Sequence, residues 1–162
     1  MKKPIVNIAD VELQPRPPHM RPTGRAAERF DARMALISPQ LGAKKLGYNL
    51  TAVPPGKRAF PFHNHRLNEE MFYIIEGSGE VRIGQETYPV RAGDIVACPP
   101  GGPELAHQIV NTGDVELRYL AVSTMETPEV CEYPDSGKIG VLGDGMRYVN
   151  RSDAQVGYWD GE

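Results

Sequence analysis

Cysteine is scarce in this sequence, with two residues, Cys98 and Cys131, among 162. Two thiols cannot supply the disulfide framework on which small secreted domains depend, so we expect both to be free. Cys98 ends the apolar run DIVAC, where a small buried core residue is the expected role. A metal ligand or a nucleophile is the alternative role for this thiol.

Long apolar segments and clusters of positive charge are also missing. No segment approaches the length of a membrane span, and the start, MKKPIVNIADVELQPRP, lacks the apolar core of a signal peptide. The formal net charge of -3 leaves no basic footprint for nucleic acid. We therefore expect a cytoplasmic protein that binds a small molecule and neither nucleic acid nor a membrane.

Proline and glycine divide the chain into three parts around one expected domain. Residues 1–45 contain a Pro- and Arg-rich stretch and a short amphipathic segment, RAAERFDARMALI, which together predict an extended arm. Residues 46–124 consist of short apolar runs separated by turns that contain glycine. Such a pattern indicates an all-β barrel or sandwich of antiparallel strands, in which Val81 and Ile83 face opposite to their neighbours.

The last part, residues 125–162, is rich in Gly, Asp and Pro and therefore looks like a loop. It nevertheless carries four large amphipathic rings, Tyr133, Tyr148, Tyr158 and Trp159. Rings of this kind are uncommon in a free tail. We expect the tail to pack on the barrel or on a second subunit, and the sequence leaves both options open.

Residues of metal-ligand types gather in two segments, GKRAFPFHNHRLNEEMFYIIEG (56–77) and GDIVACPPGGPELAHQIVN (93–111). His63 and His65 are two residues apart, so in a strand both side chains leave the same face of the sheet. Glu70 opens the next apolar run, and His107 belongs to a later one. Imidazole and carboxylate suit Mn, Fe, Ni, Cu or Zn, and the lack of a thiolate argues against a closed structural zinc site.

Each of these residues also has a purely structural explanation. A lone histidine in a strand is usually a surface or core residue, and Glu69 with Glu70 could be a solvated acidic pair. Glu69 also competes with Glu70 for the role of carboxylate ligand. Continuing the strand alternation from Glu70 puts Phe72 and Ile74 on its side, where they would line a barrel. The alternation therefore favours Glu70.

The two segments resemble the signature motifs of the cupin superfamily, in which a small β-barrel holds one metal through HxH, a Glu and a later His. The first segment follows the family spacing except for one extra residue between Gly56 and His63. In the second, the GPELA stretch lengthens the interval before the histidine. The resemblance covers about residues 46 to 123. It implies a double-stranded β-helix (jelly-roll barrel) and one divalent metal ion bound by His63, His65, Glu70 and His107.

The whole chain further resembles small single-domain cupins that are named as sugar phosphate isomerases. This resemblance implies a metal that acts as a Lewis acid on a carbonyl and its adjacent hydroxyl, and it implies a homodimer, since such cupins commonly pair. Three other classes stay open: a dioxygenase or oxalate-handling oxidoreductase, a sugar- or small-acid-binding module without turnover, and a metal-stabilised structural protein. The fold alone cannot choose among them, because one barrel hosts many activities.

The residues that would contact a substrate are less evident in the sequence than the metal ligands. Lys57 and Arg58 precede the histidine pair and could hold a phosphate or carboxylate, although an ordinary solvated pair at a turn is the alternative. Tyr48, Tyr73 and Glu104 are further candidates because they lie close to the motifs. No dedicated general base is identifiable from the sequence.

Overall fold

Antiparallel strands are the main regular elements of the computed structural model, which describes residues 4–143, 145–153 and 155–162. The six-stranded sheet has the spatial order β1 (Gln14–Pro15), β2 (Arg33–Leu36), β3 (Leu46–Val53), β10 (Leu117–Thr124), β5 (Glu70–Glu76) and β8 (Ile95–Cys98). The three-stranded sheet has the order β7 (Glu86–Arg91), β6 (Ser78–Ile83) and β9 (His107–Val110). The four-stranded sheet has the order β13 (Met146–Arg151), β12 (Lys138–Gly143), β11 (Glu129–Tyr133) and β4 (Asn64–His65).

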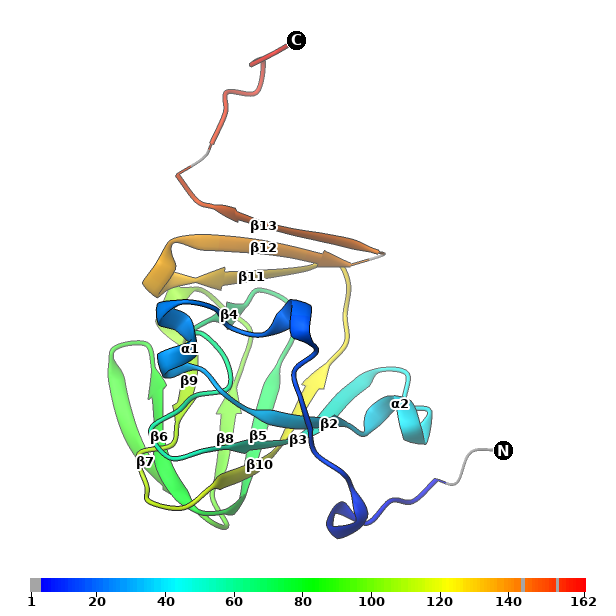
Figure 1. Ribbon diagram of the computed structural model, residues 1–162. Coiled ribbons are helices and arrows are strands. Elements are labelled where there is room, and N and C mark those ends of the chain that lie inside the picture. Colours follow the sequence, from blue (N-terminus) through cyan, green and yellow to red (C-terminus); the bar gives the residue numbers. More distant parts are fainter. Residues whose placement is uncertain (1–3, 144, 154) are drawn as a thin grey trace.

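Helices contribute little to this fold. The α-helices are α1 (Arg25–Arg29) and α2 (Ser38–Leu41), and the 3₁₀ turns are η1 (Ile8–Asp10), η2 (Pro18–Met20), η3 (Pro103–Leu105) and η4 (Pro134–Ser136). Within the described residues, none of these is long and apolar enough to cross a membrane. The prediction of an all-β barrel is thereby confirmed (Figure 1).

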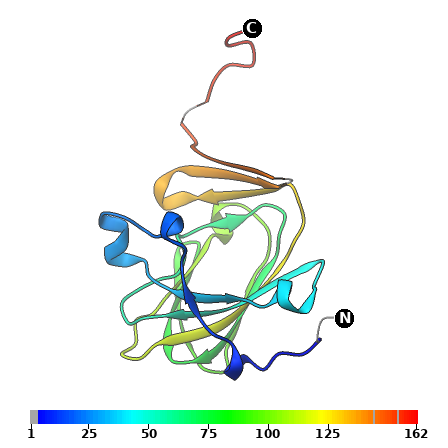
Figure 2. The same ribbon diagram turned by 45° about the vertical axis from the view of Figure 1, so that its right-hand side comes forward.

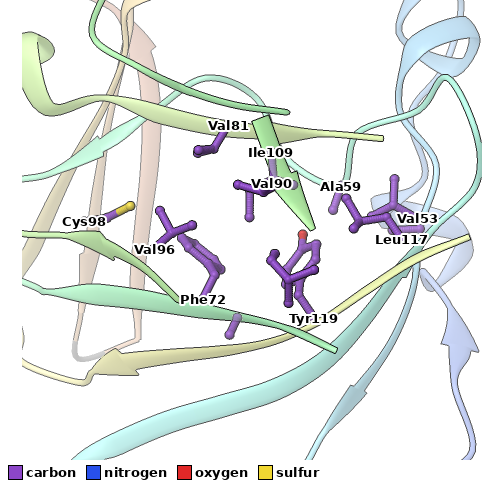
Figure 3. Close-up of a cluster of buried hydrophobic side chains, with 13 residues drawn as sticks. Val53, Ala59, Phe72, Val81, Val90, Val96, Cys98, Ile109, Leu117 and Tyr119 are labelled. Atoms are coloured by element: carbon purple, nitrogen blue, oxygen red, sulfur yellow. The ribbon is translucent and has the colours of Figure 1, made fainter. Parts of the chain in front are cut away.

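The barrel interior is filled by side chains that alternate along the strands. Tyr119 of β10 lies opposite Thr51 of β3 on one side and Ile74 of β5 on the other. Its ring meets that of Phe72 edge to face, with centroids 5.7 Å apart, and Figure 3 shows the two rings among the other core side chains. Cys98 is buried at the edge of this cluster, as the sequence predicts, and both cysteines are free.

The turn between β5 and β6 depends on a glycine of the first sequence motif. Gly77 has a φ of +81°, which glycine adopts without steric cost. A Cβ at this position would lie 2.6 Å from the carbonyl oxygen of Glu116, which is too close for any side chain. The glycine thus allows the end of β5 to pass against the start of β10.

The segments on either side of residues 46–124 also contribute strands. The amphipathic segment 25–37 divides into α1 and β2, and β1 and β2 extend the six-stranded sheet beside β3. In the predicted tail, β11 pairs with β12 on one side and with β4 on the other. Figure 1 shows these C-terminal strands lying together beside β4. This part of the tail therefore packs on its own barrel.

The last residues of the tail behave differently from β11. Beyond β13 the chain leads away from the barrel (Figure 2). Tyr158 and Trp159 contact each other but are largely exposed. Of the rings that the sequence singles out in the tail, Tyr133 packs on the barrel, whereas these two project from it.

Candidate metal centre

Four side chains that the sequence predicts as metal ligands lie together in the structure. Oε2 of Glu70 is 2.9 Å from Nε2 of His107, 3.3 Å from Nε2 of His65 and 3.7 Å from Nε2 of His63. One carboxylate oxygen thus faces three imidazole nitrogens. The four side chains are only 3% to 17% exposed, so the cluster is largely shielded from water.

The cluster forms where the three sheets meet. His65 comes from β4, Glu70 begins β5, and His107 begins β9. The backbones of His63 and His107 pair directly, through hydrogen bonds of 3.2 Å and 2.7 Å between their amides and carbonyls. Because each strand also belongs to a different sheet, the closure of the barrel sets the distances among these side chains.

Neighbouring groups orient two of the imidazole rings. Nδ1 of His63 is 2.9 Å from the carbonyl oxygen of Pro61, so this nitrogen donates its proton and leaves a lone pair on Nε2. Nδ1 of His65 faces the sulfur of Cys131 at 3.4 Å and Oε2 of Glu129 at 3.6 Å. In both residues, therefore, Nε2 is the nitrogen that faces Glu70.

The charges of the cluster are unevenly shared. Burial and the nearby imidazole of His107 lower the pKa of His63 to about 4. Burial also opposes a charge on His65, but contacts with Cys131 and Glu70 outweigh it and raise its pKa to about 10. Burial alone would raise the pKa of the Glu70 carboxyl. Hydrogen bonding from His107 and His65 outweighs this effect and holds the pKa well below its usual range. Glu70 is therefore an ionised carboxylate.

These donors fit a divalent metal ion. Nε2 of His65 is buried without a well-aligned hydrogen bond to any described residue, although the carboxylate is 3.3 Å away. Nε2 of His63 keeps its lone pair, and a cation would take the place of the protons through which His65 and His107 contact the carboxylate, since a metal ligand must be deprotonated. The ligand atoms of His63, Glu70 and His107 all lie within 4.8 Å of one another, and His65 completes the set from 3.3 Å beyond the carboxylate oxygen.

Strand β11 brings further side chains to the cluster that no motif in the sequence indicated. The ring of Tyr133 stacks on that of His63, with centroids 6.2 Å apart and planes 18° apart. From the start of the neighbouring strand β12, Nζ of Lys138 lies 5.2 Å from the centre of the Tyr133 ring. Glu129 and Cys131 lie behind His65. In the sequence, the aromatic residues of the tail were the one indication that any of these side chains would lie near the cluster.

The two tyrosines that the sequence nominated for substrate binding lie away from the cluster. Tyr73 stands between the inward-facing Phe72 and Ile74 of β5, so it points to the opposite face of the sheet and is exposed. Tyr48 pairs with Val122 of β10, on that same outward face. Strand alternation therefore separates both rings from the proposed ligands.

The charged candidates for substrate binding have other neighbours. Nζ of Lys57 donates to the carbonyl oxygen of Glu28 at 2.6 Å, which ties the ammonium to the end of α1. The guanidinium of Arg58 lies over the ring of Phe30, with its carbon 5.9 Å from the ring centre. Glu104 is exposed and accepts a hydrogen bond of 3.1 Å from the amide of Gly102. These contacts do not involve the four candidate metal ligands.

Comparison with protein families and relatives agrees with this geometry. The Cupin domain family matches residues 49–123, a range that includes the four candidate ligands. Polyketide synthase CurC from Streptomyces cyaneus is 30% identical over 120 residues, which are 74% of this chain and 68% of that protein. An oxalate-binding protein from Thermotoga maritima is 34% identical over 70 residues, 43% of this chain and 54% of that protein.

An uncharacterised protein from Methanocaldococcus jannaschii is 38% identical over 71 residues, which are 44% of this chain. The chain spans 54% of the length of this archaeal relative.

Solved structures extend the likeness to most of the chain. A candidate sugar phosphate isomerase from Acidithiobacillus ferrooxidans is 25% identical, with a TM-score of 0.72 over 78% of this chain and 80% of that one. A sugar phosphate isomerase of the cupin superfamily from Silicibacter pomeroyi is 24% identical, with a TM-score of 0.80 over 97% of this chain and 98% of that one. At this identity the second likeness shows the fold alone.

Proposed function

Since this chain belongs to the cupin superfamily, we propose that it binds one divalent metal ion through His63, His65, Glu70 and His107. The observation that carries the proposal is the convergence of three Nε2 atoms on one carboxylate oxygen, at 2.9 Å to 3.7 Å. Mn, Fe, Ni, Cu and Zn all accept these ligands, and selection among them depends on geometry and availability.

We propose further that the protein is a small-molecule enzyme that resembles the sugar phosphate isomerases. Its support is the likeness to the candidate isomerase from Acidithiobacillus ferrooxidans, which covers most of both chains. Four protein ligands leave one or two positions open on a six-coordinate ion, where a substrate can bind. The bound ion would supply Lewis-acid polarisation of a carbonyl and its adjacent hydroxyl.

The residues of the chain would prepare the cluster for such a substrate. Glu70 supplies the negative charge that keeps a cation in place, and the carbonyl of Pro61 keeps the lone pair of His63 directed at it. Tyr133 stacks on His63 from β11. Burial raises the pKa of this phenol, so it stays protonated at neutral pH. Tyr133 is therefore our candidate for donating a hydrogen bond to a substrate oxygen.

A second candidate function is the binding of a small acid, with or without oxidation. It is favoured by the oxalate-binding relative from Thermotoga maritima, which matches this chain at 34% identity. A small carboxylate would occupy the same open positions of the metal ion. An iron or manganese ion at this centre would also suit an oxidoreductase of the dioxygenase or oxalate type.

The activity is tested with metal-loaded protein and a panel of aldose and ketose phosphates in deuterated water. We expect interconversion, or exchange of the hydrogen next to the carbonyl, followed by NMR, and no reaction with chelated protein. Oxygen consumption with small organic acids, without isomerisation, would replace this proposal with the oxidoreductase. A ligand that raises the melting temperature without turnover would favour the binding module, because binding to the native state alone stabilises it.

We also propose that the protein is a homodimer in which the edge of β13 takes part. β13 ends its sheet, and its six residues, which include Met146, Tyr148 and Val149, are exposed. Natural sheets usually cover or pair such edges. Light scattering at micromolar concentration should give twice the chain mass of 17.9 kDa, and Val149→Lys should give the single mass. A single mass for the unaltered protein would contradict the proposal.

A further inference from the structure

Strand β4 depends on β11 for the placement of its histidine. β4 has two residues, and in β11 Cys131 pairs with His65 and Glu132 with Asn64. Through this pairing, Cys131 and Glu129 come to lie behind the imidazole of His65, next to Nδ1. The opposite nitrogen, Nε2, faces Glu70. The two nitrogens of this one ring therefore have separate sets of neighbours.

The carboxylate of Glu129 is 4% exposed and held rigidly by the turn that follows His65. Its Oε1 accepts from the amides of Arg66 and Leu67, at 3.0 Å and 3.2 Å. Its Oε2 accepts from the amide of Asn68 at 2.8 Å and from the side-chain amide of the same residue. Every one of these partners is an N–H donor, so the group acts here as a hydrogen-bond acceptor.

This arrangement argues against a second metal ion behind His65. The ligand atoms of His65, Glu129 and Cys131 do lie within 4.8 Å of one another. A cation among them would have to compete with the four N–H donors that already occupy the carboxylate of Glu129. The carboxylate of Glu129 can only accept, so its place beside Nδ1 instead favours a proton on that nitrogen.

We infer that Glu129 and Cys131 are positioning residues that keep the proton of His65 on Nδ1 and so reserve Nε2 for the metal ion. A neutral imidazole carries one proton, and the nitrogen without it binds the metal. Pro61 has the same effect on His63 through its carbonyl. The inference rests on the proposed metal centre. It makes β11, which lies outside both sequence motifs, a part of the metal site.

The test compares Glu129→Gln and Cys131→Ala with the unaltered protein. Glu129→Gln keeps the shape of the side chain but removes the negative charge that faces Nδ1. Loss of an outer group that supports a metal-bound histidine typically weakens binding about 10- to 100-fold, and the Glu129 carboxylate lies 3.6 Å from Nδ1, so we expect a loss in this range for Zn²⁺ measured by chelator competition. Cys131→Ala should have a smaller effect in the same direction.

The position of the proton separates this role from a merely structural one. In the Zn²⁺-loaded protein, two-bond ¹H–¹⁵N NMR spectra should show the proton of His65 on Nδ1, and Glu129→Gln should weaken or lose this signature. Glu132→Gln is the matched control, because it removes a charge from the same strand where the carboxylate contacts Asn64 and Arg66. Its affinity and proton signature should match those of the unaltered protein.

Two results would overturn the inference: a proton on Nε2 of His65 in the Zn²⁺-loaded protein, or unchanged Zn²⁺ affinity in both Glu129→Gln and Cys131→Ala. Failure of the unaltered protein to bind Zn²⁺ at all would instead refute the metal centre itself. Amide spectra of each variant check that the fold is intact. A Glu129→Gln variant that unfolds leaves Cys131→Ala and the spectrum of the unaltered protein to decide.

Discussion

Replacement of both His65 and His107 by alanine is expected to abolish stoichiometric metal binding. The two imidazoles supply two of the four donors, and their Nε2 atoms are the nearest to Oε2 of Glu70. A cation left with one imidazole and one carboxylate would be exposed to exchange with water. Elemental analysis of protein purified without chelator measures the metal content directly.

The sequence offers a matched control for this experiment. His19 is the remaining one of the four histidines, and it lies in η2, within the N-terminal arm. His19→Ala removes an imidazole without touching the cluster, so its metal content should equal that of the unaltered protein. Full occupancy in the His65→Ala, His107→Ala protein would show that the assigned ligands are not the ones that bind.

Among the single substitutions proposed for this protein, replacement of Tyr119 by alanine should lower the free energy of unfolding the most. Its side chain is 1% exposed and packs on Phe72 in the middle of the barrel. Truncation of a buried aromatic residue usually costs about 3–5 kcal/mol. Domains are stable by only about 5–15 kcal/mol, so a large share of the free energy of unfolding would be lost. Urea denaturation measures this loss.

The comparison is cleanest in chelated protein, because a bound metal adds its own stabilisation. Tyr88→Ala is the control, since Tyr88 lies in β7 with half of its surface exposed. Substitutions at such positions usually change stability by no more than about 0.5 kcal/mol. Equal midpoints for Tyr119→Ala and Tyr88→Ala would contradict the assignment of Tyr119 to the core.

Local sequence patterns were sufficient to predict the fold class and to nominate the four ligands. The alternation from Glu70 to Phe72 and Ile74 selected Glu70 over Glu69, and in the structure it is Glu70 that faces the imidazoles. The same alternation places Tyr73 on the outer face. Nearness in sequence was the ground for nominating Tyr73, and neighbours along a strand point to opposite faces. Alternation along the strand therefore predicted which side chains face the cluster better than nearness in the sequence did.

The neighbours of the cluster were beyond the reach of such patterns. Glu129, Cys131 and Tyr133 follow both motifs in the chain, in a segment rich in turn residues. Their place beside His63 and His65 depends on the pairing of β11 with β4. Pairing between distant strands leaves little trace in one sequence, because any short alternating segment can pair with several others. The sequence predicted an extended arm, and the pairing of β1 and β2 with the six-stranded sheet went unpredicted for the same reason.

The sequence by itself determined the strand periodicity, the turn glycines and the types of donor, because these depend on residues a few positions apart. Only the tertiary structure decided which nitrogen of each histidine faces Glu70 and which groups stand behind the rings. Closure of the barrel brings β4, β5, β9 and β11 together from separate parts of the chain. Side-chain distances between such strands arise from packing and register, which local propensity does not specify.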